Sequence, residues 1–328
     1  MAAAAMICLP ACSDDDPATP ETLPPYKPIT PPEPEPEPEP DVPVSITSGM
    51  AVLNNGYICL KQDMERGGSI SYLSRSNEDR SVVNIFDEGR LIQQSYYAGH
   101  VINRQNDGQS PSWSPWSWNP IQGGNYAGKK SRVIEGKLTK TSLYVKCAPM
   151  QWDMNNHEAD AIMEQWTELE GNVVHVRNRF TINSIPEVYK GPGEHDQEIP
   201  AVYPISALSN LYTYTGDQPF TNEAVAKLDL VQLTNGAWGR YSNITEKWMA
   251  FVDNTSWGLA VYSPEATHFN AGIAGGTGGE AMSAETCHVA PLFRKTLKAG
   301  DVLEYEYYLI LDRLDSIRST IYKLKNKQ

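Results

Sequence analysis

The segment VVHVRNRFTI, residues 173–182, alternates side-chain character along its whole length. Its even-numbered residues, from Val174 to Ile182, are apolar except for Asn178, whereas the odd-numbered residues from His175 onward are polar. Successive side chains of a strand point to opposite faces of a sheet, whereas a helix repeats every 3.6 residues. The segment therefore predicts a strand with one face on a core and the other toward water.

Strand patterns recur along much of the chain. Further strands are expected at SISYL (69–73), at RVIEGKLTK and SLYVKC on either side of Thr141, at WMAFVDN (248–254) and WGLAVY (257–262), and at LEYEYYLIL (303–311). The segments 248–254 and 257–262 are separated by two residues, which favours a hairpin. Helical pattern is confined mostly to LDSIRSTIYKLKNK at the C-terminus. No fixed-period repeat points to a propeller or solenoid. We predict an all-β fold, a large antiparallel β-sandwich with a short C-terminal helix.

The N-terminus reads MAAAAMICLPACSDDD, an apolar run that ends at Cys12 and turns abruptly acidic. It resembles a bacterial lipoprotein signal, although no Lys or Arg precedes the apolar run. The resemblance implies that residues 1–12 are signal peptide and lipobox and that Cys12 is lipidated. The chain would then be anchored to the outer membrane, at the cell surface or facing the periplasm. A poorly ordered N-terminus is the alternative.

Residues 13–44 are expected to form an extended linker. They hold nine Asp or Glu residues against the single Lys27, and the run PPEPEPEPEPD alternates proline with charge. Such a segment cannot bury apolar surface and is semi-rigid. The linker accounts for much of the net charge of −13, and no basic stripe appears elsewhere. Nucleic acid is therefore not an expected partner. The body, residues 45–328, is expected to be one β-sandwich carbohydrate-active domain.

Cysteine usage and motifs predict neither a metal site nor a cofactor. Past the signal, Cys59, Cys147 and Cys287 remain, widely spaced and without a CxxC pair. One disulfide among them or buried free thiols are equally compatible with the sequence. The glycine-rich GGTGGE at 275–280 lacks the spacing of a nucleotide-binding loop and is interpreted as a flexible loop.

Three segments carry a resemblance to galactose mutarotase-like domains. RGGSISYLS (66–74) looks like the opening of such a β-supersandwich, MEQWTELEGNVVHVRNRFTI (163–182) looks like its paired strands, and GDVLEYEYYLIL (300–311) looks like its closing strands. The superfamily includes sugar epimerases and domains of polysaccharide lyases and glycoside hydrolases. The resemblance implies a poly- or oligosaccharide ligand on a concave sheet. It does not define one reaction.

Two polar-aromatic segments are candidate parts of a sugar site, because aromatic rings pack on sugar C–H faces while polar groups bind hydroxyls. The first is GRLIQQSYYAGH (89–100) with the tryptophan loop WSPWSWNPIQGGN (113–125). Its candidate catalytic residues are Tyr97 and His100. Its candidate substrate-binding residues are Arg90, Gln94, Trp118, Asn119, Gln122 and Asn125. The alternative is that some of these rings belong to the core.

The second segment is GEHDQEIPAVYP (193–204). If it is extended, Glu194, Asp196 and Glu198 share one face and His195 points away. Crowded carboxylates repel one another, which would raise the pKa of at least one and suit it to acid/base chemistry. Glu198 and His195 are therefore candidate catalytic residues, and a solvated acidic loop is the alternative.

The sequence contains one further group of ionisable residues, and it is compatible with several functions. His157, Glu158 and Asp160 in MNNHEADA are interpreted as a turn rather than a catalytic or metal cluster. The leading hypothesis is a surface-anchored polysaccharide lyase or glycoside hydrolase. The alternatives are a non-catalytic glycan-binding lipoprotein and a sugar epimerase-like or structural module. Epimerase chemistry needs a His and a Glu in defined roles, which no motif here supplies.

Overall fold

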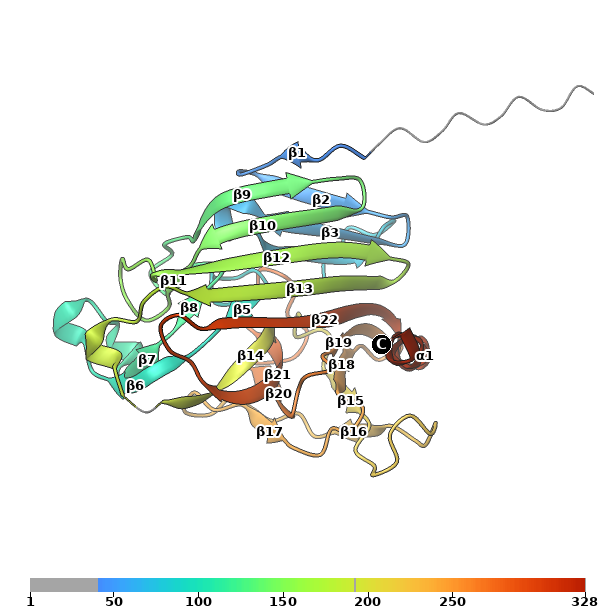
Figure 1. Ribbon diagram of the computed structural model, residues 1–328. Helices are drawn as coiled ribbons and strands as arrows, with labels where there is room; N and C mark the ends of the chain where they lie inside the picture. Colours follow the sequence, from blue (N-terminus) through green and yellow to red (C-terminus); the bar gives the residue numbers. More distant parts are fainter. Residues whose placement is uncertain (1–40, 192, 328) are drawn as a thin grey trace, which may run out of the picture. The chain divides into compact units, whose positions relative to one another are not determined.

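The computed structural model describes residues 41–191 and 193–327. The signal, Cys12 and nearly all of the predicted linker lie outside the described residues. The described part is built almost entirely of antiparallel strands in two large sheets, which we call sheet A and sheet B (Figure 1). The predicted all-β sandwich is thereby confirmed.

Sheet A has the strand order β1-β9-β10-β12-β13-β22-β19-β18-β15-β16. Its strands are β1 (Val44–Ser45), β9 (Arg132–Leu138), β10 (Ser142–Ala148), β12 (Ala161–Glu170), β13 (Val173–Ile182), β15 (Asn210–Thr213), β16 (Ala226–Leu228), β18 (Trp248–Val252), β19 (Trp257–Tyr262) and β22 (Val302–Arg313). The strand predicted at 173–182 is β13, and its even-numbered residues are buried. The predicted hairpin is the antiparallel pair β18–β19.

Sheet B has the order β17-β20-β21-β14-β5-β4-β3-β2, with β8 and β11 beside it. Its strands are β2 (Met50–Asn54), β3 (Ile58–Asp63), β4 (Ser69–Arg75), β5 (Ile92–Ser95), β8 (Pro120–Ile121), β11 (Met150–Gln151), β14 (Glu194–Val202), β17 (Gly239–Tyr241), β20 (His268–Ala274) and β21 (Thr286–Thr296). A separate two-stranded sheet pairs β6 (Ala98–Ile102) with β7 (Trp116–Trp118). Short 3-10 turns cover Met64–Arg66, Gln105–Asp107, Pro111–Trp113 and Glu187–Tyr189.

The main core lies between the inward faces of the two sheets. Val176 and Phe180 from β13 meet Ile199 and Val202 from β14 in one buried apolar cluster. Because each strand alternates, the neighbours of these residues face outward. The outward faces are therefore where polar groups can gather.

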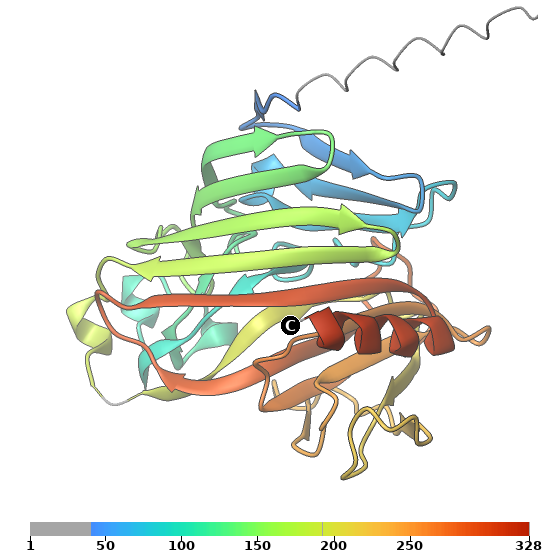
Figure 2. The same ribbon diagram turned by 45° about the vertical axis from the view of Figure 1, so that its right-hand side comes forward.

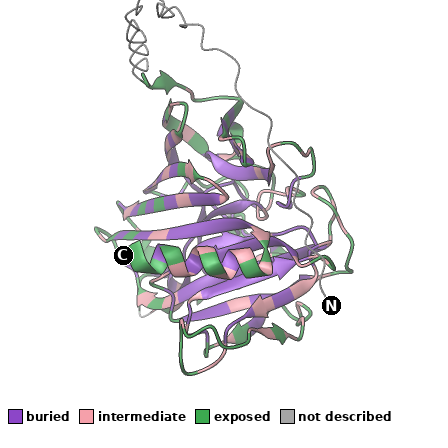
Figure 3. Ribbon diagram, turned by 90° about the vertical axis from the view of Figure 1, so that its right-hand side faces the viewer, coloured by how far each residue is buried: buried purple, intermediate pink, exposed green. Residues whose placement is uncertain are grey.

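The predicted C-terminal helix is α1 (Leu314–Lys327), which covers part of the outer face of sheet A (Figures 2 and 3). Ile317, Ile321 and Leu324, spaced three or four residues apart, form its buried stripe. They pack in a second apolar cluster that includes Trp248 and Ile310.

A buried ion pair fastens α1 to the sheet. Glu246 is fully buried and accepts hydrogen bonds from Arg318 at 2.9 Å, from Tyr322 at 2.7 Å and from the indole of Trp248 at 2.8 Å. Burial alone would raise the pKa of Glu246. The hydrogen bonds from Arg318, Trp248 and Tyr322 outweigh burial, and the pKa of Glu246 is lowered. Glu246 therefore stays ionised beneath the helix.

Candidate active site

Strand β14 carries the three carboxylates that the sequence placed on one face. Each faces a different environment, because β14 lies between β21 and β5 and runs from an exposed start to a buried end. Glu194 is exposed and accepts a hydrogen bond from Arg294 at 2.8 Å. His195 points the other way, toward the backbone oxygen of Gly99 at 2.7 Å. The predicted alternation of this strand is confirmed.

Asp196 is surrounded by cationic and imidazole groups. Its carboxylate pairs with Arg240 on β17, with His268 on β20 at 3.3 Å and with Arg294 at 3.6 Å. Partial burial would raise the pKa of Asp196, but the hydrogen bond from Arg240 and the charge of His268 outweigh burial and the pKa is lowered. Asp196 is therefore an ionised carboxylate at neutral pH.

Glu198 has the opposite character. Its side chain is only 13% exposed, and burial raises its pKa to about 7. Tyr97 donates to Oε2 of Glu198 over 3.5 Å, and Nε2 of His288 lies 3.6 Å from Oε1. From the sequence, repulsion among the three carboxylates was expected to raise the pKa of one of them. The pKa of Glu198 is raised, but repulsion is not the cause. Glu194 and Asp196 are neutralised by cations, and loss of water raises the pKa of Glu198.

A bulge in β14 directly follows Glu198. Glu198 is opposite Leu292 of β21, and the pairing resumes at Val202 opposite Val289, so β14 holds one more residue than its partner. The pairing with β5 shifts at the same place. Bulges bend a strand locally and re-aim its side chains, and they are frequent next to active sites.

His288 on β21 lies on the outward face of sheet B, because its neighbours Cys287 and Val289 belong to the core. It is fully buried, yet neither ring nitrogen has a hydrogen-bond partner among the described residues. The rings of Trp238 and Tyr203 cover it, each with its centroid 4.6 Å from the imidazole. Burial, with a contribution from the charge of Arg90, lowers the pKa of His288 to about 3. His288 is therefore a neutral imidazole beside Glu198.

Aromatic rings continue on the other side of Glu198. The ring of Tyr97 lies 6.3 Å from that of Trp116, and Trp116 meets Trp113 edge to face at 5.2 Å. These three rings are half-buried, as are Tyr203 and Trp238. Burial and the charge of Glu198 raise the pKa of Tyr97 well above its ordinary value. Tyr97 is therefore a hydrogen-bond donor here and not a base.

The assignment of Trp118 as the sugar-facing tryptophan is wrong. Its side chain is 1% exposed and its ring lies 6.3 Å from that of Phe180 in the main core. Proline and serine around the tryptophans favoured an exposed loop, but β7 pairs with β6 and carries Trp118 inward. Trp113 and Trp116 of the same loop keep half-exposed rings.

The four amide residues expected to bind substrate instead make hydrogen bonds to backbone groups of the protein. Gln94, Asn119, Gln122 and Asn125 are each at most 1% exposed. Their side-chain amides donate to the backbone oxygens of Glu164, Tyr96, Gly67 and Met154, respectively. Amides buried in this way are committed to structural bonds. The expectation that they contact a ligand is therefore corrected.

The remaining candidates lie at different distances from Glu198. His195 contacts Gly99 and belongs to the scaffold that holds β6. His100 packs closely against Gly191 on the chain segment before β14. Arg90 lies beside Tyr203, with its guanidinium carbon 5.5 Å from the ring centroid. Arg90 and Tyr97 thus reach the surroundings of Glu198, whereas no contact in the described structure joins His100 or His195 to its carboxyl.

The other sequence candidates have ordinary structural roles. Glu158 pairs with Arg132, and Asp160 accepts from Ser184 and Asn183, as in a turn. Cys59, Cys147 and Cys287 are free thiols. Within the described ranges, no group of three or more His, Cys, Asp or Glu side chains is placed to hold a metal ion. No helix in those ranges is long and apolar enough to cross a membrane.

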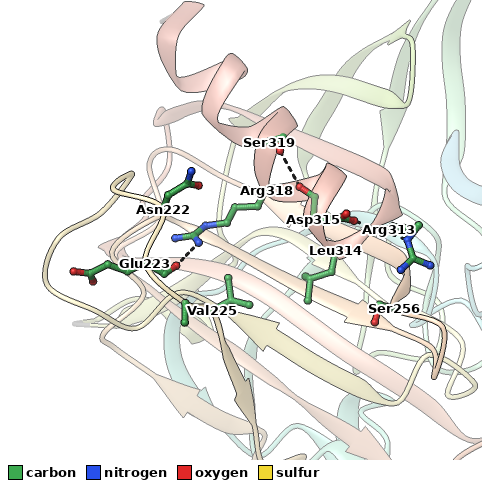
Figure 4. Close-up of a pocket in the computed structure, with 10 residues that line it drawn as sticks. Asn222, Glu223, Val225, Ser256, Arg313, Leu314, Asp315, Arg318 and Ser319 are labelled. Atoms are coloured by element: carbon green, nitrogen blue, oxygen red, sulfur yellow. Dashed lines mark hydrogen bonds and ion pairs between the residues drawn. The ribbon is translucent and has the colours of Figure 1, made fainter.

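A cavity of about 470 Å³ lies beside the start of α1 (Figure 4). Its lining includes Glu223, Val225, Arg313, Asp315 and Arg318. The guanidinium of Arg318 is already engaged by the backbone oxygen of Glu223 and by Glu246. Arg318 of this cavity thus anchors the helix.

Sequence reasoning missed His288, Trp238 and Tyr203 as parts of the site. They come from β21, the segment before β17 and the end of β14, and only sheet pairing brings them together. One signal was available: His288 is a polar residue inside the otherwise apolar run CHVAPLF.

Comparison with known proteins gives structural neighbours only. The chain matches no protein-family model, and no curated protein matches it. Among solved structures, a putative aldose 1-epimerase from Escherichia coli K12 is 11% identical, with a TM-score of 0.45 over 81% of this chain and 99% of that one. A galactose mutarotase-like protein from Lactobacillus casei is 12% identical, with a TM-score of 0.48 over 80% and 100%. A GH36 α-galactosidase from Geobacillus stearothermophilus is 13% identical, with a TM-score of 0.43 over 80% and 40%.

Two of these names belong to the group that the sequence segments resemble. All three identities are below 25% and all three TM-scores are below 0.5, so we draw neither activity nor site residues from them. The fold is defined by the strand pairing above, and the site by its own contacts.

Proposed function

We propose that this chain is a carbohydrate-active protein that binds a saccharide over Glu198 on the outward face of sheet B. Half-buried rings stand on both sides of this carboxyl, Tyr97 and Trp116 on one and Tyr203 and Trp238 on the other. Ring faces of this kind pack against the C–H face of a pyranose, and polar groups between them bind its hydroxyls.

The observation that carries the proposal is the contrast between two carboxyl groups on one strand. Glu198 has a pKa raised to about 7, whereas that of Asp196 is lowered. A pair of carboxyls with pKa values pushed apart is the arrangement of an acid and its ionised partner. Glu198 would protonate the leaving glycosidic oxygen, and the Asp196 carboxylate would take a proton from the water that attacks the anomeric carbon.

Hydrolysis is favoured over elimination by the state of Tyr97. A lyase base must remove a proton next to a carboxylate, and a tyrosine does this only when its pKa is depressed. The pKa of Tyr97 is raised instead. Residues two apart on a strand are about 6.6 Å apart along its axis. Side chains at this backbone spacing can place their carboxyls at the separation of inverting hydrolases, which is roughly 6.5–9.5 Å.

A non-catalytic glycan-binding protein is the second candidate, and the partners of Asp196 favour it. Arg240, His268 and Arg294 all approach that carboxylate. A carboxylate with this many cationic and imidazole neighbours is a weak base toward water. The aromatic rings would then hold a glycan without cleaving it.

We also propose that the chain is a lipoprotein attached through Cys12 and carried on the surface of the outer membrane. This proposal depends on the N-terminal sequence alone, MAAAAMICLPACSDDD followed by the acidic proline-rich run. The acidic linker would hold the sandwich away from the membrane, where extracellular glycans are accessible.

A polysaccharide and oligosaccharide panel tests the proposed activity on residues 41–328. Each sugar is assayed for new reducing ends, for unsaturated ends that absorb in the ultraviolet, and for retardation of the protein in glycan-containing gels. Hydrolysis predicts reducing ends without ultraviolet absorbance. Retardation without products supports the binding candidate, and unsaturated ends indicate a lyase. No retardation and no products across the panel would contradict the proposal.

A further inference from the structure

Among the described residues, Arg90 is a positive charge without an anionic partner, at the edge of the proposed site. Within residues 41–191 and 193–327, the ion pairs include every arginine except Arg90 and Arg177. Arg177 is exposed and lies over the ring of Trp166. Arg90 is half-buried, and its guanidinium makes a single long hydrogen bond, from Nη2 to the backbone oxygen of Ala284 at 3.4 Å.

The Nε group of Arg90 is buried and has no acceptor. A buried donor without an acceptor is unfavourable, and it is more so on a charged group. An arginine presents Nε–H and a terminal N–H on one edge, which matches the two oxygens of a carboxylate or the oxygens of a sulfate. The Nε–H edge of Arg90 is therefore free to receive an anionic partner.

The neighbours of Arg90 connect it to Glu198. Its guanidinium lies over the ring of Tyr203, Tyr203 packs on His288, and His288 lies 3.6 Å from Glu198. Both ring nitrogens of His288 also lack partners although the imidazole is fully buried. Two orphaned polar groups thus both pack against Tyr203, and one of them, His288, lies beside the proposed acid.

Loop geometry holds Arg90 in this place. The next residue, Leu91, has a φ of 75°, in the left-handed region that a leucine rarely adopts. Its backbone is fixed by bonds with Asn84 and Tyr203. Backbone strain held by surrounding structure is common at functional sites.

We propose that the saccharide is acidic and that Arg90 binds its anionic group, a uronate carboxylate or a sulfate ester. This inference rests on the proposed function, because it names the substrate class of the same site. The net charge of −13 does not oppose it. A polyanion such as nucleic acid would need a basic groove, and the sequence shows no basic stripe. A single anionic group needs only one arginine.

The test compares charged sugars with neutral counterparts of the same linkage. Trigalacturonate is titrated against its carboxyl-reduced form, and a sulfated oligogalactose against its desulfated form, by calorimetry. The variants are Arg90→Gln, Arg90→Lys and the control Arg177→Gln, which removes the other unpaired arginine from a different sheet. Thermal unfolding verifies that each variant is folded.

We expect one charged sugar to bind more tightly than its neutral form, and Arg90→Gln to weaken that binding about tenfold or more. Binding of the neutral form should change less than about twofold, because the sugar rings are held by other residues. Arg90→Lys should lie between wild type and Arg90→Gln, and Arg177→Gln should behave as wild type. A preference for trigalacturonate over its reduced form identifies a carboxylate as the anionic group. A preference for the sulfated oligogalactose over its desulfated form identifies a sulfate.

Three outcomes separate the failures. If neutral and charged sugars bind equally, and Arg90→Gln leaves both unchanged, the acidic-substrate inference is overturned while the saccharide site stands. If Arg177→Gln weakens binding as much as Arg90→Gln, the assignment to Arg90 is overturned. If no sugar in this set or in the wider panel binds or reacts, the proposed function itself fails.

Discussion

Oε1 of Glu198 lies 3.6 Å from Nε2 of His288, and the imidazole is neutral because burial lowers its pKa to about 3. A protonated histidine at this place would have stabilised the carboxylate. The neutral ring and the surrounding aromatics instead favour the protonated acid, whose pKa is raised to about 7. The pair thus keeps a carboxylic acid protonated close to neutral pH.

Glu198→Gln should stabilise the fold at high pH. The folded-state pKa of Glu198 is raised, so its protonation favours the folded state below about pH 4.5 and that contribution is lost as pH rises through about 7. A shift from 4.5 to about 7 corresponds to about 3 kcal/mol. In urea unfolding, the variant should match wild type near pH 4 and exceed it by up to about 3 kcal/mol at pH 8.

The matched control is Glu194→Gln, on the same strand face but with a side chain 58% exposed. It should change the free energy of unfolding by less than about 1 kcal/mol at either pH. Equal stability of wild type and Glu198→Gln at pH 8 would show that Glu198 has an ordinary pKa.

Trp116→Ala and Trp118→Ala should have opposite effects. Trp116 is half-buried beside Tyr97, so its loss should weaken saccharide retention by about 1 kcal/mol and leave the fold intact. Trp118 is a core residue, so its loss should destabilise the protein by about 3–5 kcal/mol. Gel retardation and urea unfolding measure the two effects. A folded Trp118→Ala protein with weakened sugar binding would restore the original assignment.

Arg318→Met should destabilise the protein strongly, because it leaves Glu246 charged and buried. Breaking a buried pair in this way costs about 3–5 kcal/mol. Arg313→Met is the control: its side chain is 58% exposed, lies 3.9 Å from Asp315 and donates one exposed hydrogen bond to the backbone oxygen of Thr255. Its loss should therefore cost less than about 1 kcal/mol. Urea unfolding with circular dichroism measures both. Similar losses for the two variants would contradict the role of Glu246 as the anchor of α1.

Cys12→Ser should abolish lipidation. In cells fed radiolabelled palmitate, the wild-type chain should incorporate label and partition with the outer membrane, because a lipobox cysteine is the acceptor. The variant should do neither. Label in the variant, or an unlabelled soluble wild-type protein, would contradict the lipoprotein proposal.

Alternation along single strands made much of the fold predictable from the sequence. The bounds of β13 match the predicted 173–182, and the hairpin β18–β19 and helix α1 were expected from local pattern. Each of these depends on neighbours in the sequence. The carboxylate face of β14 was predicted for the same reason.

The site itself was less predictable, because it is assembled across strands. Nothing near Glu198 in the sequence indicates that β21 lies beside β14 and brings His288 to its carboxyl. Trp118 was misplaced because loop composition resembles exposure, whereas pairing of β6 with β7 decides burial. The amides of Gln94 and Asn119 were expected to bind sugar, but nearby backbone groups needed them as partners.

The most direct test of the central claim is the pH dependence of kcat/KM for wild type and Glu198→Gln on a sugar that the panel identifies. If Glu198 is the general acid, wild-type kcat/KM falls as pH rises through about 7. The variant should lose about 100-fold or more of the rate, while its affinity for the sugar stays within a few-fold. A variant that retains the wild-type rate and pH profile would contradict the account.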